Sequence, residues 1–255
     1  MARIHALVVL CLLLTVGAGC LTFGDDNPTT ETLLADLNET DPPETVAATF
    51  EANWTYEGAT LSLSYDAWYR SDGASRVEND VGGRTTVTVD DGDRRWRYDP
   101  GQNTVRVRPG GSGDDPVTQM RRGLARILQT APVTDIRETQ YQGRTVYHLT
   151  LDPAGDRDQL VPPLLPGGIT SRDEQLDETE TPFNTTRMEL WVDAEYMFLV
   201  KQRIEGEETG VFRYRNITFE GVDDDRFEFE VPENATVQTP TDSENATDAR
   251  APITP

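Results

Sequence analysis

Apolar and polar positions alternate over residues 187–237 in a way that favours β-strands. Every second side chain is apolar or aromatic in four short runs, made of Met188, Leu190 and Val192, then Phe198, Val200 and Ile204, then Phe212 and Tyr214, and finally Phe227, Phe229 and Val231. A period of two residues is typical of a strand with one buried face. Acidic residues and glycines separate the runs. The pattern predicts an antiparallel meander with one apolar and one solvated face.

The parity of the apolar positions changes inside the third run. It moves from even to odd residue numbers between Tyr214 and Phe219, passing through Ile217. One extra residue in a strand has this effect, so we expect a β-bulge and a bend there. A bent sheet needs something to fill its concave side.

The same alternation predicts eight more strands and hence a mainly β chain. Two long strands turn at Glu57-Gly58 to form a hairpin, and Asp-Gly and Pro-Gly pairs mark turns between shorter strands. The predicted strands cover residues 46–56, 61–69, 76–78, 85–89, 94–98, 104–108, 134–140 and 145–151. A chain of 255 residues allows one large β-rich domain or two small ones. We expect one.

One amphipathic helix interrupts the strands at residues 117–128. Asp114 or Asp115 would cap it, and Pro116 would occupy its first position. The apolar side chains at helical spacing are Val117, Met120, Leu124, Ile127 and Leu128. We expect this helix to lie across the sheet as a lid or plug, which makes the fold class mainly β, of the α+β kind.

The N-terminus reads as an export signal over residues 1–19. A basic start is followed by an apolar run at 6–16 and then by Gly17-Ala18-Gly19-Cys20. The run is short for a membrane span, which favours a processed signal. Cys20 is placed as in a lipobox, although Gly17 replaces the usual larger aliphatic residue. Lipidation of Cys20 would anchor the protein on the outer face of the cell membrane; simple cleavage and an incidental cysteine are the alternatives.

Three segments lack the periodicity of a packed domain. Residues 20–43 are acidic and rich in Thr and Pro, and form a tether with one short helix at 31–37, capped by Thr29 or Thr30. Residues 152–183 make a long loop that is either functional or disordered. Residues 238–255 are predicted to be a disordered tail.

Six Asn-X-Thr sequons support export and suggest a glycosylated surface protein. Each is weak alone, because a threonine-rich chain produces such triplets by chance. The candidate asparagines are Asn38, Asn53, Asn184, Asn216, Asn234 and Asn245.

The charge of the chain is strongly negative and its basic residues are almost all arginine. The net charge is -22, and Lys201 is the only lysine. Self-repulsion of this size destabilises a compact state in dilute salt, whereas at about molar ionic strength the Debye length falls to about 3 Å. We interpret the composition as adaptation to high salt. It also argues against a nucleic-acid partner, which would require clustered cations.

No motif in the sequence points to catalysis, a cofactor or a metal. His148 is the only histidine after the signal, and it lies on a predicted strand with no catalytic motif around it. The acidic runs at 90–93 and 223–225 lack the spacing of a calcium loop and read as solvated turns. We expect no catalytic residue, no metal and no cofactor.

Three stretches together resemble the LolA-like lipoprotein carrier superfamily. They are the hairpin at 91–107, which reads DGDRRWRYDP and continues through Asn103 to Val107, the strand and turn at 188–193, which read MELWVD, and the ending at 227–235, which reads FEFEVPENA. The resemblance implies a domain over residues 44–237. It also implies a strongly curved antiparallel sheet that forms an unclosed half-barrel, with a few helices on its concave side.

Several members of that superfamily bind acyl chains in the concavity, so the resemblance implies a cavity for a lipid or for a lipoprotein acyl chain. The residues expected near such a cavity are Phe50, Trp54, Leu63, Tyr65, Trp68, Met120, Leu124 and Ile127. The chain departs from the soluble carriers by its predicted anchor and by its 152–183 loop.

Two functions from different classes remain open. In the first, the half-barrel binds a hydrophobic ligand under the helix. In the second, the concavity is filled core and the protein is a cell-surface interaction or envelope-sensing module with an envelope protein as partner. An enzyme without a recognisable motif is the remaining alternative.

Overall fold

The computed structural model describes residues 28–56, 58–80, 83–110, 115–152, 185–207 and 209–239. The signal peptide, Cys20, nearly all of the 152–183 segment, Asn184 and the tail that holds Asn245 lie outside the described residues. The predictions on those segments stay predictions.

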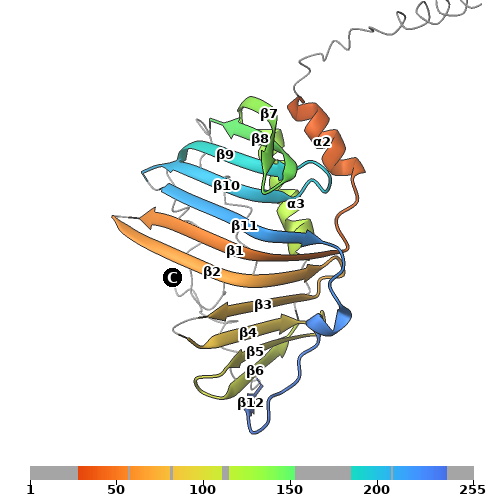
Figure 1. Ribbon diagram of the computed structural model, residues 1–255, viewed down its shortest axis with the longest axis vertical. Helices are drawn as coiled ribbons and strands as arrows, with labels where there is room; N and C mark the ends of the chain where they lie inside the picture. Colours follow the sequence, from red (N-terminus) through yellow and green to blue (C-terminus); the bar gives the residue numbers. More distant parts are fainter. Residues whose placement is uncertain are drawn as a thin grey trace, which may run out of the picture.

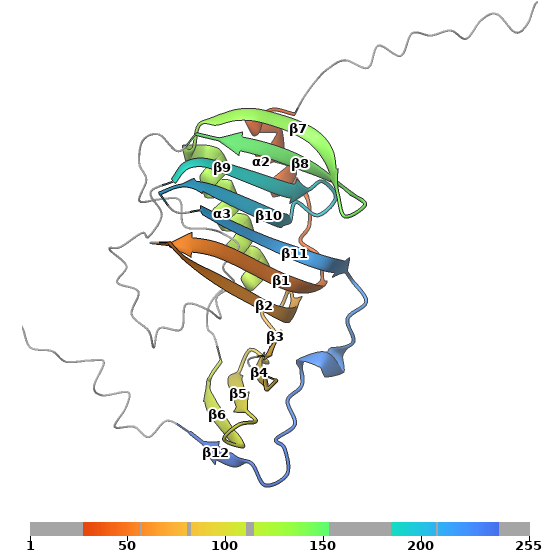
Figure 2. The same ribbon diagram turned by 60° about the vertical axis from the view of Figure 1, so that its left-hand side comes forward.

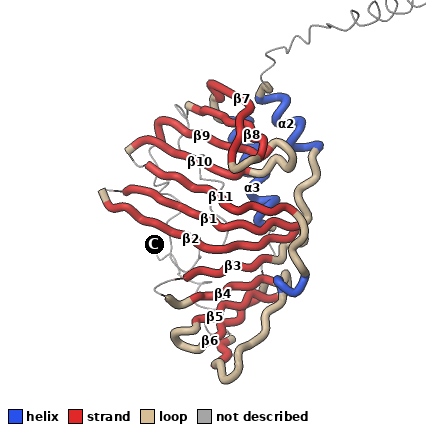
Figure 3. Tube along the Cα trace, viewed as in Figure 1, coloured by secondary structure: helices blue, strands red, loops and turns tan. Residues whose placement is uncertain are grey.

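Twelve strands form one curved, open sheet in the described part of the chain (Figures 1 and 3). The order is β12-β6-β5-β4-β3-β2-β1-β11-β10-β9-β8-β7, so the edge strands β12 and β7 do not meet. The strands are β1 (Thr45–Tyr56), β2 (Ala59–Arg70), β3 (Ser75–Asp80), β4 (Thr85–Asp90), β5 (Arg94–Asp99), β6 (Thr104–Pro109), β7 (Val133–Tyr141), β8 (Arg144–Leu151), β9 (Thr185–Asp193), β10 (Leu199–Gly206), β11 (Thr209–Phe219) and β12 (Thr236–Gln238). The predicted mainly β, unclosed sheet is confirmed.

The sheet is mixed rather than purely antiparallel, because β12 runs parallel to β6. All other neighbouring pairs are antiparallel. At the centre, β1 pairs with β2 over its whole length on one side and with β11 on the other. One continuous sheet therefore joins the two halves of the chain.

The bulge predicted in the third run of the meander is present in β11. Thr49 of β1 pairs with Arg215, and Ala47 pairs with Thr218, so Asn216 and Ile217 together face one residue of β1. Asn216 has a φ of 53°, a left-handed conformation that asparagine tolerates better than most residues. This extra residue explains why the apolar positions change from even to odd numbers in the sequence of β11.

The main core lies on the concave face of β1, β2 and β8–β11. Side chains from alternate positions of these strands are almost completely buried, among them Phe50, Leu149, Leu190 and Phe212. Burial of one such side chain contributes roughly 1.5 to 3 kcal/mol. The alternation in the sequence follows directly from this one-sided burial.

Helix α3 (Pro116–Thr130) packs its apolar stripe against this core (Figure 2). The Asp115 side chain caps its N-terminus by accepting a hydrogen bond from the Thr118 amide, and Pro116 occupies the first turn, as predicted. Pro132 lies just beyond the C-cap Ala131, where it cannot continue the helix. The predicted cover over the sheet is confirmed.

A second helix, α2 (Thr30–Glu39), also belongs to the core. Thr29 is its N-cap, and Leu33 and Leu37, one helical turn apart, are buried in the main cluster. The sequence predicted this helix as part of a tether. Its buried leucines instead make the folded unit begin ahead of residue 44.

Beyond β2 the apolar side of the sheet changes. Val89, Val105 and Phe227 are buried but do not belong to the main cluster, and Val89 pairs across strands with Trp96 on the outer, convex face. A C-terminal strap, residues 223–238, runs along the ends of β3–β6 to β12 (Figure 1), and its Arg226 and Phe229 side chains contact the outer face. Phe229 of the strap stacks on Trp96, with ring centroids 5.5 Å apart.

The strand predicted at Phe227, Phe229 and Val231 is wrong. Residues Asp224–Phe227 form a 3-10 helix, η2, and the chain stays unpaired up to β12. The two phenylalanines alternate because each packs on the outer face: Phe227 lies under the Arg70 guanidinium, and Phe229 lies on Trp96. The alternation of these two phenylalanines therefore reflects packing onto the face of the sheet and not pairing as a strand.

Candidate functional site

Most of the side chains predicted to surround a cavity come together on the concave face. Phe50 of β1 contacts Tyr65 of β2, with ring centroids 4.9 Å apart, and both are buried. From the opposite side, α3 contributes three of its apolar side chains, Met120, Leu124 and Ile127, all buried in the same cluster. Trp54 and Leu63 are half-buried and pack at the margin of this cluster.

Trp68 is the exception among the predicted residues. It follows Ala67, whose side chain belongs to the main cluster, so the strand alternation places Trp68 on the outer face. There its ring lies 4.6 Å from the Arg226 guanidinium of the strap. Trp68 therefore holds the strap and does not lie near the concave face.

The buried end of the concave face contains tyrosine hydroxyls that sequence reasoning did not single out. The Tyr65 and Tyr69 hydroxyls are buried and interact with each other and with the Tyr214 hydroxyl, although neither of the two makes a hydrogen bond of good geometry within the described residues. Burial raises the pKa of Tyr65, Tyr69 and Tyr214, so all three hydroxyls remain protonated at neutral pH. An unsatisfied buried hydroxyl costs about 1 to 3 kcal/mol. A polar ligand atom or water would remove that cost.

The other end of the concave face is open and still apolar. Here the β1–β2 hairpin presents Trp54, which stacks on Phe212 with centroids 6.4 Å apart. Leu61 pairs with Trp54 across the strands and is 50% exposed, and its neighbour on the same face, Leu63, is half-buried. The apolar strip thus continues from the buried interior to the surface.

Arg121 fastens the two helices to the sheet at one end of α3. Its guanidinium donates to the carbonyls of Leu37 and Thr40 at the C-terminal end of α2, and to the carbonyl of Tyr196 between β9 and β10. Burial lowers the pKa of this arginine, which still stays charged. These hydrogen bonds satisfy backbone carbonyls that have no partner within the helix at its C-terminal end. They hold the first turns of α3 in place.

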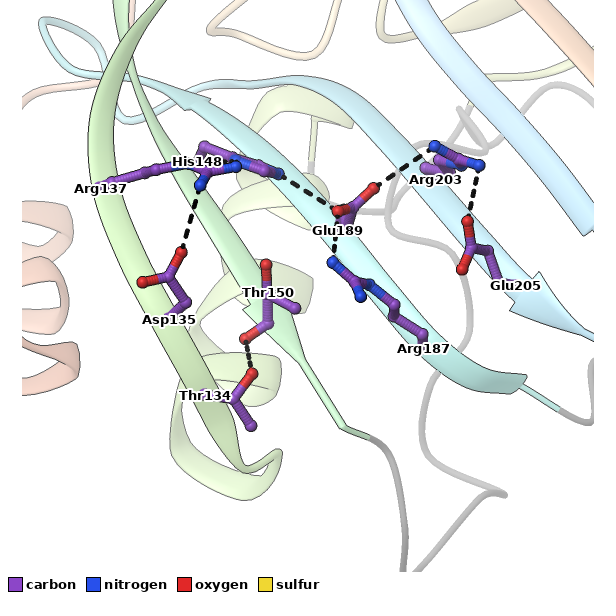
Figure 4. Close-up of polar contacts among 9 residues, drawn as sticks. All are labelled: Thr134, Asp135, Arg137, His148, Thr150, Arg187, Glu189, Arg203 and Glu205. Carbon is purple, nitrogen blue, oxygen red and sulfur yellow. Dashed lines mark hydrogen bonds and ion pairs between the residues drawn. The ribbon is translucent and has the colours of Figure 1, made fainter.

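On the outer face, His148 sits in a polar cluster formed by β7–β10 (Figure 4). Its Nδ1 accepts from Arg137 at 2.9 Å, and its ring stacks on Trp191 at 4.4 Å. Its Nε2 lies 3.7 Å from Glu189, which also pairs with Arg187. Burial, and then the Arg137 charge, lower the pKa of His148. The ring is therefore neutral at pH 7 and acts as a packed, hydrogen-bonded side chain.

A pocket of about 300 Å³ lies at the bulge of β11, apart from the concave face. The Tyr141 hydroxyl and the Gln142 amide both donate to the Tyr214 carbonyl, which joins the turn between β7 and β8 to β11. The lining residues are Tyr141, Gln142, Arg144, Val146, Val200, Asn216 and Ile217. Several of these polar groups already make hydrogen bonds or ion pairs within the protein, so we do not assign a ligand to this pocket.

The acidic run at 90–93 closes the turn between β4 and β5, whereas the run at 223–225 begins the 3-10 helix η2. Asp91 Oδ1 accepts from the amides of Asp93 and Arg94, and Asp90 accepts from the Gly92 amide. Within the described ranges, no group of three or more His, Cys, Asp or Glu side chains is arranged to hold a metal ion. Neither α2 nor α3 has the length and apolar character of a membrane-spanning helix, and the rest of the described chain supplies no other candidate.

Four of the sequon asparagines lie in the described chain, and all four are exposed. Asn38 is at the end of α2, Asn53 is on the outer face of β1, Asn216 is at the bulge, and Asn234 is in the strap. Three of them already make hydrogen bonds, since Asn53 accepts from the Ser62 hydroxyl, the Asn216 amide donates to Gln142, and the Asn234 carbonyl accepts from Asn103. Glycosylation of these sites stays a prediction.

Comparison with known proteins found matches among solved structures alone. No protein-family profile matches the sequence, and no curated protein is similar to it. Solved structures similar to the chain include a LolA superfamily protein from Nitrosomonas europaea, with 11% identity over 79% of this chain and 98% of the other at a TM-score of 0.33. The curved, open sheet with helices on its concave side is the architecture that the sequence resemblance implied. The fold is LolA-like.

Two other solved structures match with similar coverage. The Mycobacterium tuberculosis lipoprotein LppX matches with 15% identity over 76% of this chain and 98% of its own, at a TM-score of 0.42. An uncharacterized conserved protein from Thermus thermophilus matches with 11% identity over 82% of this chain and 98% of its own, at a TM-score of 0.45. At these identities the likeness is one of fold alone.

Proposed function

We propose that this LolA-like protein binds a hydrophobic ligand, a lipid or a lipoprotein acyl chain, on its concave face. The observation that carries the proposal is the apolar strip that runs from the open β1–β2 hairpin into the buried aromatic interior. Exposed apolar surface costs about 25 cal/mol per Å², which an acyl chain would offset by covering it. The Tyr65 and Tyr69 hydroxyls further along the face, which make no hydrogen bond of good geometry, support the same reading.

Replacing Leu61 with arginine is expected to weaken ligand binding without unfolding the protein. Leu61 is 50% exposed at the open end of the strip, so a charge there is solvated in the free protein and must be buried or displaced in the complex. Titration with a fluorescent fatty acid should show affinity at least about tenfold lower, equivalent to about 1.4 kcal/mol.

The matched control is Ser62→Arg, one residue along β2 and on the opposite face. It carries the same charge change and should leave affinity unchanged. Equal effects of the two variants, or no saturable uptake by the folded wild type, would sink the proposal.

We further propose that the protein is an extracytoplasmic lipoprotein held at the membrane by Cys20. The export signal and the Gly19-Cys20 junction support this, and both lie outside the described residues. The protein purified from membranes is expected to begin at a Cys20 that carries lipid on its thiol, and Cys20→Ser should release it into the medium. Mass spectrometry of the mature N-terminus decides, and an unmodified terminus at another residue would contradict the anchor.

The second candidate is a cell-surface interaction or envelope-sensing module. The observation in its favour is the close packing beneath α3, where Phe50, Leu124 and Ile127 are at most 2% exposed. If this filled interior extends along the whole face, the ligand titration above will show no uptake. A protein partner then becomes the better explanation.

A further inference from the structure

The concave face changes from apolar to cationic along single rows that cross the sheet. Cross-strand pairing connects one residue of each strand from β1 to β6. The first row is Ala48, Ala67, Val77, Thr88, Arg97 and Arg106, and the second is Val46, Tyr69, Ser75, Asp90, Arg95 and Arg108. Paired residues share a face of the sheet. The arginines of β5 and β6 therefore stand on the same face as the apolar strip.

These four side chains form an arginine face, defined as Arg95, Arg97, Arg106 and Arg108, and all are exposed. Two carboxylates accompany it: Asp90 pairs with Arg95 at 2.9 Å, and Asp99 binds backbone amides of its own turn. Among the described residues, Arg97 and Arg106 have no ion-pair partner.

The arrangement is unfavourable unless something compensates it. Arg97 lies directly opposite Arg106, and like charges at such positions destabilise a sheet. The chain as a whole has 45 acidic residues against 23 basic ones, so chance does not readily place four arginines together. An anion on this face would remove the repulsion.

We propose that the arginine face binds the anionic head group of an amphiphilic lipid whose chains lie on the apolar strip. This inference rests on the proposed function and names the class of its ligand. Strands are spaced about 4.8 Å apart, so three spacings place the head group about 14 Å from the buried β2 side chains. Tail and head group would then meet apolar and cationic surfaces on one continuous face.

Arginine suits this role because its guanidinium donates two parallel hydrogen bonds to a phosphate. Such contacts act at hydrogen-bond distance and survive salt that screens longer-range attraction. Neither α2 nor α3 lies over β5 and β6 (Figures 1 and 2), and the four arginines of this face are exposed.

The test compares two lipids that have the same acyl chains, phosphatidylglycerol and diacylglycerol, as competitors of a bound fluorescent fatty acid. The full-length protein should prefer the anionic lipid by at least about tenfold, because only its phosphate can accept charge-assisted hydrogen bonds from the arginines. The double variant R97Q/R106Q should lose this preference and keep its affinity for diacylglycerol. Both side chains are exposed, so circular dichroism should show an unchanged fold.

The matched control is R187Q/R203Q, which makes the same charge change on the outer face, where both arginines are about half exposed. It should keep the preference for the anionic lipid. A wild type that binds both lipids equally, a double variant that keeps its preference, or a control that loses it would overturn the inference and leave the proposed function intact. Failure of both lipids to bind would overturn the proposed function itself.

Discussion

The melting midpoint of this protein is expected to rise by more than about 5 °C between dilute and multimolar potassium chloride. With a net charge of -22, the folded chain repels itself, and screening relieves that repulsion as the Debye length falls from about 10 Å to about 3 Å. For a domain of this size each kcal/mol of added stability raises the midpoint by about 2 to 4 °C. Thermal unfolding followed by circular dichroism gives the midpoints.

A matched series in sucrose separates screening from general exclusion of solutes from the surface. Sucrose should raise the midpoint much less than the salt does. Equal midpoints at low and high salt would mean that the acidic composition has no bearing on stability, and the interpretation of the chain as adapted to salt would be wrong.

Phe50→Ala should destabilise the fold by about 3 to 5 kcal/mol. The Phe50 ring is completely buried at the centre of the concave face, between Tyr65 at 4.9 Å and Tyr214 at 5.3 Å. Its removal leaves a cavity that rigid strands on both sides cannot close. Urea unfolding at high salt measures the change in the free energy of unfolding.

Ser64→Ala is the control, because Ser64 is exposed on the outer face of the neighbouring strand. It should change stability by less than about 0.5 kcal/mol. A loss below about 1 kcal/mol for Phe50→Ala would show that the concave face is loosely filled, in conflict with the burial described above.

The sequence predicted the strands that bury one face and the helix whose start is marked by nearby capping residues. Strand alternation located β1, β2 and β8–β11, and the Asp115 cap with Pro116 located the start of α3. Even the bulge at Asn216 could be inferred, because an extra residue shifts every following side chain to the other face. These signals are local, and no distant part of the chain had to be known to read them.

The remaining features depend on contacts between distant segments. Strand alternation alone puts Trp68 on the outer face, but its contact with Arg226 comes from far along the chain, and Phe227 and Phe229 alternate without pairing. The arginine face was hidden for a related reason. In β4–β6 the apolar side faces outward, so the polar positions, which a single-strand pattern assigns to solvent, lie on the concave side.

The position of the strap also governs the order in which the fold can be completed. Strands β3–β6 end at residue 109, yet their outer apolar face is contacted by residues 223–238, the last described elements of the chain. Contacts of such high sequence separation form slowly, because a long stretch of chain must be ordered to close them. Until then, Val89 and Trp96 stay open to solvent. This half of the sheet should therefore reach its native state last, and its unprotected face is where a partly folded chain would self-associate.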